Sequence, residues 1–214
     1  MRAAEPGMTL KKPGQLLTRL LRKHLVPEDP QAASLIEKLC HVRQRGQFTR
    51  SEFLTMCRWK SPRAVGRCAS NSHHRVRHVS RGIFNTRLEA ERLDLLTSLA
   101  GVGIPTASAI LTLTDPRRYG VIDIRAWQEL YRLGAVQDRP GGQGFRLEHW
   151  LQYLRILRAE AARLKVTARQ VEYSLFTYHQ AQQEGALYKT KRRFPVPRAT
   201  ANGINRQGST ECDV

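Results

Sequence analysis

Apolar residues recur along most of this chain at the spacing of amphipathic helices, and no stretch alternates between apolar and polar residues like a series of strands. The segment 86–99 is the clearest case, because its five leucines show helical spacing. The pattern predicts an all-α fold, a single domain of about eight to ten helices. The expected helices cover residues 14–25, 29–46, 49 onward, 61–71, 72–84, 86–99, 105 onward, 124–133, 145–164 and 168 onward.

Local signals at the helix ends support these boundaries. Asp29-Pro30 is an N-cap followed by a proline in the first turn, and Gly46 is typical of a residue that ends a helix. Thr49-x-x-Glu52 and Thr167-x-x-Gln170 are capping boxes, which predict that helices begin there.

The composition changes near the C-terminus. Most of the 214 residues lie in apolar-periodic segments, and 41% of the chain is hydrophobic, enough to bury a core. From residue 188 the sequence is basic and aperiodic and contains Pro and Gly. We therefore predict a flexible N-terminus at 1–13, an all-α domain at 14–187 and a basic disordered tail at 188–214.

The charge of the chain indicates a polyanionic partner. Its 36 Lys and Arg residues outnumber its 18 Asp and Glu residues, and the net charge is +18. Residues 57–81 alone carry seven Lys or Arg and three His without a single acidic residue. A solvated face usually mixes both signs, so this stretch favours a nucleic acid over an anionic membrane.

No feature of the sequence indicates a membrane or a secretory route. Residues 1–15 lack the apolar stretch of a signal peptide, and no apolar run approaches the roughly 20 residues that span a bilayer. We expect a cytoplasmic protein without a membrane partner, associated with the nucleoid if its source is bacterial.

The cysteines are few and irregularly spaced, which favours reduced thiols. Cys57, Cys68, His73, His74 and His78 are close in sequence, and a metal site there is the weaker alternative. The cluster has no CxxC pair, and the spacing between its two cysteines is long for a zinc knuckle. We therefore expect neither a metal nor a cofactor.

The stretch LAGVGIPTASAIL, residues 99–111, has the features of a turn that binds a phosphate. Gly101 and Gly103 permit a positive φ and a close backbone approach, and Pro105 suits the first turn of the helix that follows. Unpaired N–H groups at that helix N-terminus favour an anion. A plain turn between packed helices is the alternative. The expected DNA contacts of this stretch are Gly101, Val102, Gly103, Thr106 and Ala107.

LAGVGIPTASAIL closely resembles the helix-hairpin-helix of the DNA glycosylase superfamily that includes endonuclease III. In that family the hairpin holds the DNA backbone, and a catalytic Asp lies about twenty residues beyond it. Asp123, in YGVIDIRAW, lies 22 residues after Gly101 and matches this spacing. The resemblance covers residues 85–135, and the helical remainder is compatible with it.

Three departures from the family pattern limit what the resemblance implies. Its bifunctional members carry a lysine, which forms a Schiff base with the sugar, where this chain has Pro105. The Thr-His that follows the family's Asp is replaced by Ile124-Arg125, and the four-cysteine loop for an iron–sulfur cluster is absent. The resemblance thus implies a cluster-free, monofunctional relative or a non-catalytic one, with no lyase activity expected.

Asp123 has two interpretations that the sequence leaves open. A carboxylate near the sugar stabilises the positive charge that develops when an N-glycosidic bond breaks, and can orient the attacking water. Asp is equally suited to cap the helix that begins at residue 124. The two roles are compatible.

The remaining candidate contacts surround this centre. Trp59 can stack on an extruded base, although a tryptophan at such a position more often packs in the core. Arg58, Lys60 and Arg63 are candidates for phosphate contacts, with Lys60 as a relocated Schiff-base lysine the weakest alternative. Arg125 can contact a phosphate or pair with Asp123. Trp127 and Trp150 have the spacing of core residues, and Tyr173 and Tyr178 can line a pocket, although packing is the favoured role.

The sequence is therefore compatible with three functions. The first is a monofunctional DNA glycosylase that acts as a monomer on a flipped base in double-stranded DNA. The second is a non-catalytic DNA-binding module that uses the same hairpin and basic surface. The third is a helical protein that binds RNA or another protein. The target base, and whether the role is repair or attack on foreign DNA, are not encoded in any motif.

Overall fold

The helices expected from the sequence are present in the computed structural model, which describes residues 13–184. The predicted flexible N-terminus (1–13) and basic tail (188–214) lie, apart from Pro13, outside the described residues. The helices are α1 (Pro13–His24), α2 (Pro30–Arg45), α3 (Arg50–Lys60), α4 (Val65–Cys68), α5 (His73–Asn85), α6 (Glu89–Thr97), α7 (Ile104–Thr114), α8 (Ile124–Arg132), α9 (Leu147–Leu164) and α10 (Ala168–Gln182), with a 3-10 turn at Pro62–Ala64. The described part contains no strand, which confirms the all-α prediction.

Most of the predicted helix ends are confirmed by their hydrogen bonds. Asp29 caps α2 by accepting a hydrogen bond from the amide of Ala32, and Gly46 ends that helix with a φ of 70°. The capping box of Thr49 and Glu52 forms in full at the start of α3. Residues 61–71 do not form the one helix that was predicted, because the 3-10 turn of Pro62–Ala64 precedes the short α4.

The capping box predicted at α10 is only half formed. Thr167 accepts a hydrogen bond from the amide of Gln170, as expected. The Gln170 side chain instead donates to the carbonyl oxygen of Val26, which lies between α1 and α2. A tertiary contact has therefore replaced the second, local hydrogen bond of the box.

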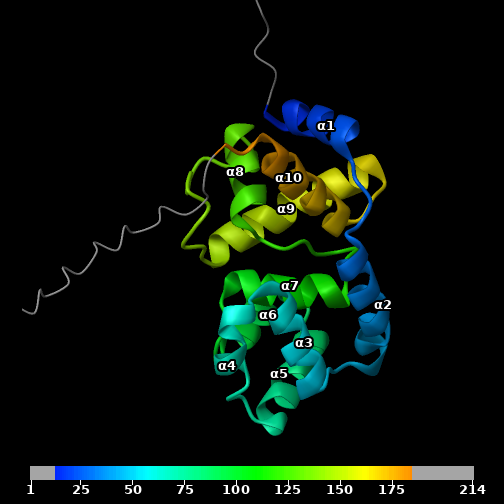
Figure 1. Ribbon diagram of the computed structural model, residues 1–214, viewed down its shortest axis with the longest axis vertical. Coiled ribbons are helices and arrows are strands. Elements are labelled where there is room, and N and C mark those ends of the chain that lie inside the picture. Colours follow the sequence, from blue (N-terminus) through cyan, green and yellow to red (C-terminus); the bar gives the residue numbers. More distant parts are fainter. Residues whose placement is uncertain (1–12, 185–214) are drawn as a thin grey trace, which may run out of the picture. The chain divides into compact units, whose positions relative to one another are not determined.

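The helices pack in two groups that meet within one compact unit ending at Gln183. In the first group α7 packs against α2, α3 and α6, and α5 packs against α6 and α3. In the second group α10 packs against α1, α8 and α9 (Figure 1). The hairpin of α6 and α7 belongs to the first group, whereas the helix that follows Asp123 belongs to the second.

The core runs through both groups of helices. Every residue of α7 from Thr106 to Thr114 is buried, which makes it the most completely enclosed helix in the described chain. Trp127 and Trp150 are fully buried, as their spacing predicted. No helix within residues 13–184 has the length and apolarity needed to cross a membrane.

The cysteines and histidines of the 57–78 cluster separate in the fold. Cys57 and Cys68 are free thiols packed in the core, where burial, together with the neighbouring Cys68, raises the pKa of Cys57 far above its usual value. His73, His74 and His78 lie on the exposed face of α5. Within the described residues, no group of three His, Cys, Asp or Glu side chains is arranged to hold a metal ion.

Candidate functional site

Of the two glycines in the turn between α6 and α7, only Gly101 has the predicted positive φ, whereas Gly103 has a φ of −95°. Gly101 adopts a φ of 79°, and a Cβ there would lie 2.8 Å from the backbone nitrogen of Cys68. The side chain of Asn71 fixes the turn, because it accepts a hydrogen bond from the amide of Ala100 and donates one to the carbonyl oxygen of the same residue. The turn is therefore held rigidly against the end of α4.

Two backbone amides at the start of α7 donate no hydrogen bond within the described structure. Gly103 is exposed and Ile104 is half-buried, and the amide of neither donates to another described residue. Both amides lie at the positive end of a helix dipole, and Pro105 adds no further donor. These two N–H groups are suited to bind an anion.

The other residues expected in this contact have packing roles. The side chains of Val102, Thr106 and Ala107 are buried. The amides of Thr106 and Ala107 already donate to the carbonyl oxygen of Gly103. Fewer amides are therefore available to an anion than the motif predicted, because α7 uses the amides that follow Pro105 for its own hydrogen bonds.

The segment that leads to Asp123 is extended, and buried side chains satisfy its backbone. Glu172 accepts a hydrogen bond from the amide of Val121, while the hydroxyl of Tyr153 donates to the carbonyl oxygen of the same residue at 2.9 Å. Ser108 accepts from the amide of Ile122 at 3.0 Å. Side chains from α7, α9 and α10 therefore immobilise the two residues that precede Asp123, which limits the positions its carboxylate can take.

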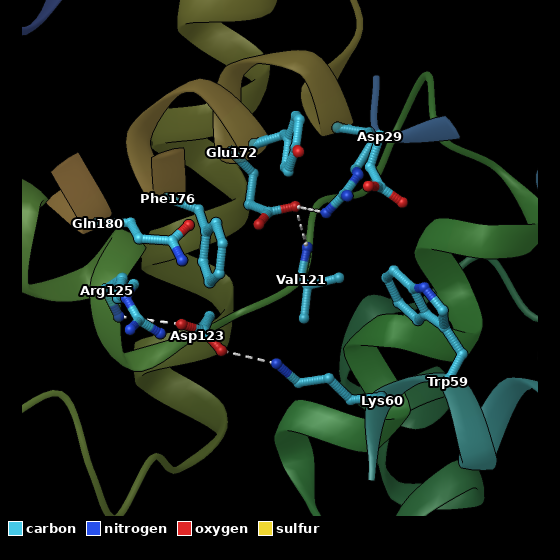
Figure 2. Close-up of a pocket in the computed structure, with 11 residues that line it drawn as sticks. Asp29, Trp59, Lys60, Val121, Asp123, Arg125, Glu172, Phe176 and Gln180 are labelled. Atoms are coloured by element: carbon cyan, nitrogen blue, oxygen red, sulfur yellow. Dashed lines mark hydrogen bonds and ion pairs between the residues drawn. The ribbon is translucent and has the colours of Figure 1, made fainter. Parts of the chain in front are cut away.

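Asp123 uses its two carboxylate oxygens for different purposes. Oδ1 accepts a hydrogen bond from the amide of Arg125 at 3.0 Å and so caps α8. Oδ2 lies 2.7 Å from Nζ of Lys60, the last residue of α3 (Figure 2). The cap therefore occupies only one oxygen, and the other faces a side chain from the first group of helices.

Asp123 and Lys60 line a pocket of about 500 Å³ where the two groups of helices meet. The pocket has contributions from the start of α2, the end of α3, the 121–125 segment and one face of α10 (Figure 2). Its lining consists of Asp29, Trp59, Lys60, Val121, Asp123, Arg125, Arg169, Glu172, Tyr173, Phe176 and Gln180. The hairpin turn at Gly101–Gly103 is not part of this lining.

The floor of the pocket contains a buried charge network on α10. Arg169 makes two hydrogen bonds of 2.8 Å to Glu28 and a further one to Glu172. Burial alone would lower the pKa of Arg169, but the carboxylates of Glu172 and Glu28 raise it instead. Burial raises the pKa of Glu172, against the opposing effect of Arg169. Because Glu172 also accepts from Val121, this network is connected directly to the segment that carries Asp123.

Aromatic rings form much of the pocket wall. Phe176 and Tyr173 come from α10, and Trp59 lies across the pocket from Phe176 (Figure 2). The guanidinium of Arg125 lies 5.2 Å from the centre of the Phe176 ring, and its Nε is buried without a hydrogen-bond partner in the described structure. Arg125 therefore lines the pocket as a cation beside the Phe176 ring, and its side chain forms no ion pair with Asp123.

The residues predicted for DNA contact fall into separate places. Trp59, Lys60 and Arg125 line the pocket with Asp123, whereas Arg58 and Arg63 are exposed and lie outside it. Trp59, for which packing in the core was favoured, is half-buried: it packs against the core and also lines the pocket. Its neighbour Lys60, predicted as a phosphate contact, is the direct partner of Asp123.

The basic stretch 57–81 is free of carboxylate partners except at Lys60. Its six arginines are exposed, and none forms an ion pair with a described Asp or Glu. These residues are Arg58, Arg63, Arg67, Arg75, Arg77 and Arg81. In the second group of helices, by contrast, Arg132, Arg158 and Arg169 are each paired with a glutamate.

Sequence reasoning named only Tyr173 on the α10 side of the pocket, and it favoured packing over a pocket role for that residue. Arg169, Glu172, Tyr173, Phe176 and Gln180 share one helical face, a spacing visible in the sequence. Their mixture of charged, amide and aromatic side chains is unusual for a face directed at the core, and this was the available signal. Nothing in the sequence indicated that Asp29 or Lys60 would lie against that face.

Comparison of the chain with protein-family models, with curated protein sequences and with solved structures finds no match.

Proposed function

We propose that this protein binds double-stranded DNA and hydrolyses the N-glycosidic bond of a flipped, damaged or modified base, with Asp123 as the catalytic carboxylate. The observation that carries the proposal is that the two carboxylate oxygens of Asp123 have different partners. One oxygen caps α8, and the other faces a pocket lined by aromatic and charged side chains.

The pocket offers what the reaction requires. Breaking the bond between base and sugar develops positive charge on the sugar, which a fixed carboxylate stabilises. A base taken out of the stack needs flat apolar surfaces, and Trp59, Tyr173 and Phe176 provide them. Arg125 supplies a hydrogen-bond donor for an acceptor on the base or for a phosphate.

The DNA backbone would be held outside the pocket. The amides of Gly103 and Ile104 bind a phosphate, and the six exposed arginines of residues 57–81 supply long-range attraction. The backbone grip explains why the hairpin itself carries no charged residue. A DNA-binding module without catalytic activity could use the same hairpin and basic surface, and it is the second candidate function.

One observation favours that second candidate function. The ion pair with Lys60 gives Oδ2 of Asp123 a partner within the protein, as a structural clasp between α3 and α8 would. In a non-catalytic module, Asp123 and Lys60 would only join the two groups of helices, and the hairpin would bind DNA without chemistry.

The test is base release from a panel of duplexes that each carry one damaged or modified base. Asp123→Asn keeps an oxygen for the cap and removes the charge, whereas Asp123→Ala removes both. We expect Asp123→Asn to melt close to the wild type and to release base at least about a hundredfold more slowly. Asp123→Ala should be as inactive, and less stable by about 1 kcal/mol from the lost cap.

Two outcomes would decide against catalysis by Asp123. If the wild type releases no base from any duplex while it still binds them, the chain is a binding module. If Asp123→Asn releases base at the rate of the wild type, Asp123 acts only as a cap and a clasp.

A further inference from the structure

Glu172 is a buried carboxylate in the wall of the pocket that contains Asp123. It lies on α10, one helical turn before Phe176, and only 1% of the residue is exposed. Burial of an acidic group is unfavourable unless its oxygens accept hydrogen bonds or pair with a cation. The partners of each oxygen therefore show what the side chain has left to bind.

The two oxygens of Glu172 have unequal surroundings. Oε2 accepts hydrogen bonds from the amide of Val121 and from the guanidinium of Arg169. Oε1 accepts none from a described residue, and Figure 2 shows this oxygen on the Phe176 side of the carboxylate. Buried polar atoms normally have a hydrogen-bond partner, so a ligand in the pocket is the natural donor for Oε1.

The charges around Glu172 favour its ionised form. Burial raises the pKa of Glu172, and the Arg169 guanidinium, the Val121 amide and Lys60 oppose that rise. An ionised carboxylate accepts hydrogen bonds and donates none. Oε1 is therefore suited to a ligand that presents an N–H or O–H group, and unsuited to one that presents only acceptors.

Aromatic rings lie close to this acceptor. Phe176 follows on the next turn of α10. The guanidinium carbon of Arg169, which binds Glu172, lies 5.6 Å from the ring centre of Trp59 and 4.8 Å from that of Tyr173. Flat rings favour a flat aromatic ligand that stacks against them. Stacking surfaces beside one fixed acceptor fit a heteroaromatic ring with an amino group at its edge.

We propose that Glu172 determines which bases the pocket takes, because its Oε1 accepts a hydrogen bond from an exocyclic amino group of the base. The proposal rests on the proposed function, which brings a base from a duplex into this pocket. Adenine, cytosine and guanine carry such an amino group, whereas thymine and uracil do not. A base without it leaves a buried oxygen unpaired, and this rejects the wrong base more strongly than an apolar pocket would. Glu172 acts in recognition, and bond cleavage stays with Asp123.

The test uses the full chain and two nucleosides that differ only in the amino group, 2′-deoxyadenosine and purine 2′-deoxyriboside. Binding is followed by NMR at pH 8 through the indole N–H signal of Trp59, which lines the pocket. The signals of the fully buried Trp127 and Trp150 are internal references. We expect the wild type to bind 2′-deoxyadenosine at least about tenfold more tightly, because the other nucleoside lacks the hydrogen bond to a charged group.

Glu172→Gln tests the residue itself. Its amide oxygen can still accept from Val121, but its NH₂ group then faces the pocket and donates instead of accepting. The preference for 2′-deoxyadenosine should fall below about twofold. Glu129→Gln is the matched control, because Glu129 is an equally buried glutamate that pairs with Arg132 outside the pocket lining. It should keep the preference of the wild type. Thermal melting shows whether each variant is folded, and the wild-type comparison decides the proposal if Glu172→Gln is not.

The outcomes separate this proposal from the proposed function. Equal affinity of the wild type for the two nucleosides, a Trp59 signal that responds to neither, or a preference that persists in folded Glu172→Gln overturns the role of Glu172. Base release from a duplex without any preference between the nucleosides would leave glycosylase activity intact and remove the recognition role. A preference that depends on Glu172, without base release from any duplex, would support Glu172 and count against base removal by Asp123.

Discussion

The two oxygens of Asp123 have different partners. The helix cap and the side chain that faces the pocket are therefore distinct roles of one residue, which the sequence alone does not separate. The cap hydrogen bond that Oδ1 accepts from the amide of Arg125 fixes the rotation of the carboxylate, and this directs Oδ2 at Lys60. The residues before Asp123 are held by hydrogen bonds to the buried side chains of Ser108, Tyr153 and Glu172. Burial raises the pKa of Tyr153 well above its usual value, so its hydroxyl stays a hydrogen-bond donor.

Gly120 is the residue that allows this support to form. A Cβ at this position would lie 2.6 Å from Cδ1 of Leu157 and 2.7 Å from Cβ of Glu172. We predict that Gly120→Ala lowers the free energy of unfolding by about 1–3 kcal/mol, because α9 and α10 must move apart to admit the methyl group. Urea unfolding measures the change, and base release should fall with it.

Gly66→Ala is the matched control for that substitution. Gly66 is helical, and a Cβ there would meet nothing within 4 Å. The alanine should leave stability unchanged or raise it by up to about 1 kcal/mol. Equal stability of Gly120→Ala and the wild type would contradict the close packing around residue 120.

At the scale of elements, the hairpin depends on residues that are close in sequence, whereas the pocket face of α10 depends on tertiary contacts. The hairpin is a local structure whose glycines and proline are needed within a few residues of one another, so its motif is recognisable. The pocket face of α10 has meaning only when α3 and the 121–125 segment lie against it. The turn was therefore recognised as a candidate anion site, a role that stays a prediction, whereas α10 was predicted only as a helix.

The two glycines of the hairpin should respond differently to alanine. Gly103 has a φ of −95°, and its Cβ would meet only the ring of Pro105 at 3.9 Å, so Gly103→Ala should fold normally. If a phosphate is bound at its amide, the added methyl group obstructs the DNA backbone, and affinity for a duplex should fall about tenfold. Fluorescence anisotropy with a labelled duplex measures this change.

Gly101→Ala provides the contrast within the same turn. Its positive φ and the close approach of Cys68 predict a loss of stability, which thermal melting would detect. If Gly103→Ala binds duplex DNA like the wild type, the amides at the start of α7 do not hold the backbone.

At the scale of the whole molecule, the arginines fall into two classes, those that are paired with a carboxylate and those that are not. Those of residues 57–81 are exposed and have no carboxylate partner in the described structure, whereas several in α8, α9 and α10 neutralise glutamates. Only unpaired, exposed cations are available to replace the counterions of DNA. The net charge of +18 therefore says less about binding than the stretch that concentrates it.

The salt dependence of duplex binding should follow this division. Each phosphate neutralised contributes about −0.9 to the slope of log affinity against log salt concentration. The double substitution Arg63→Gln and Arg77→Gln should reduce the magnitude of the slope by up to about 1.8. Arg155→Gln, at an exposed position of α9, is the control and should leave the slope unchanged. Binding that does not weaken with salt would contradict a DNA-backbone interface altogether.

The sequence alone determined the features that depend on neighbouring residues. Helical spacing, caps and the glycines of the hairpin act over a few residues, so the all-α fold, most helix boundaries and the cap at Asp123 could be predicted from it. Only the tertiary structure decided which side chains meet across long separations. Lys60 and Asp123 are 63 residues apart, and Glu172 lies 51 residues beyond Val121. Such pairs form because helix packing brings their elements together, and no local pattern encodes that distance. The glycines and proline of the turn are thus visible in the sequence itself, whereas the pairing of Lys60 with Asp123 is visible only in the fold.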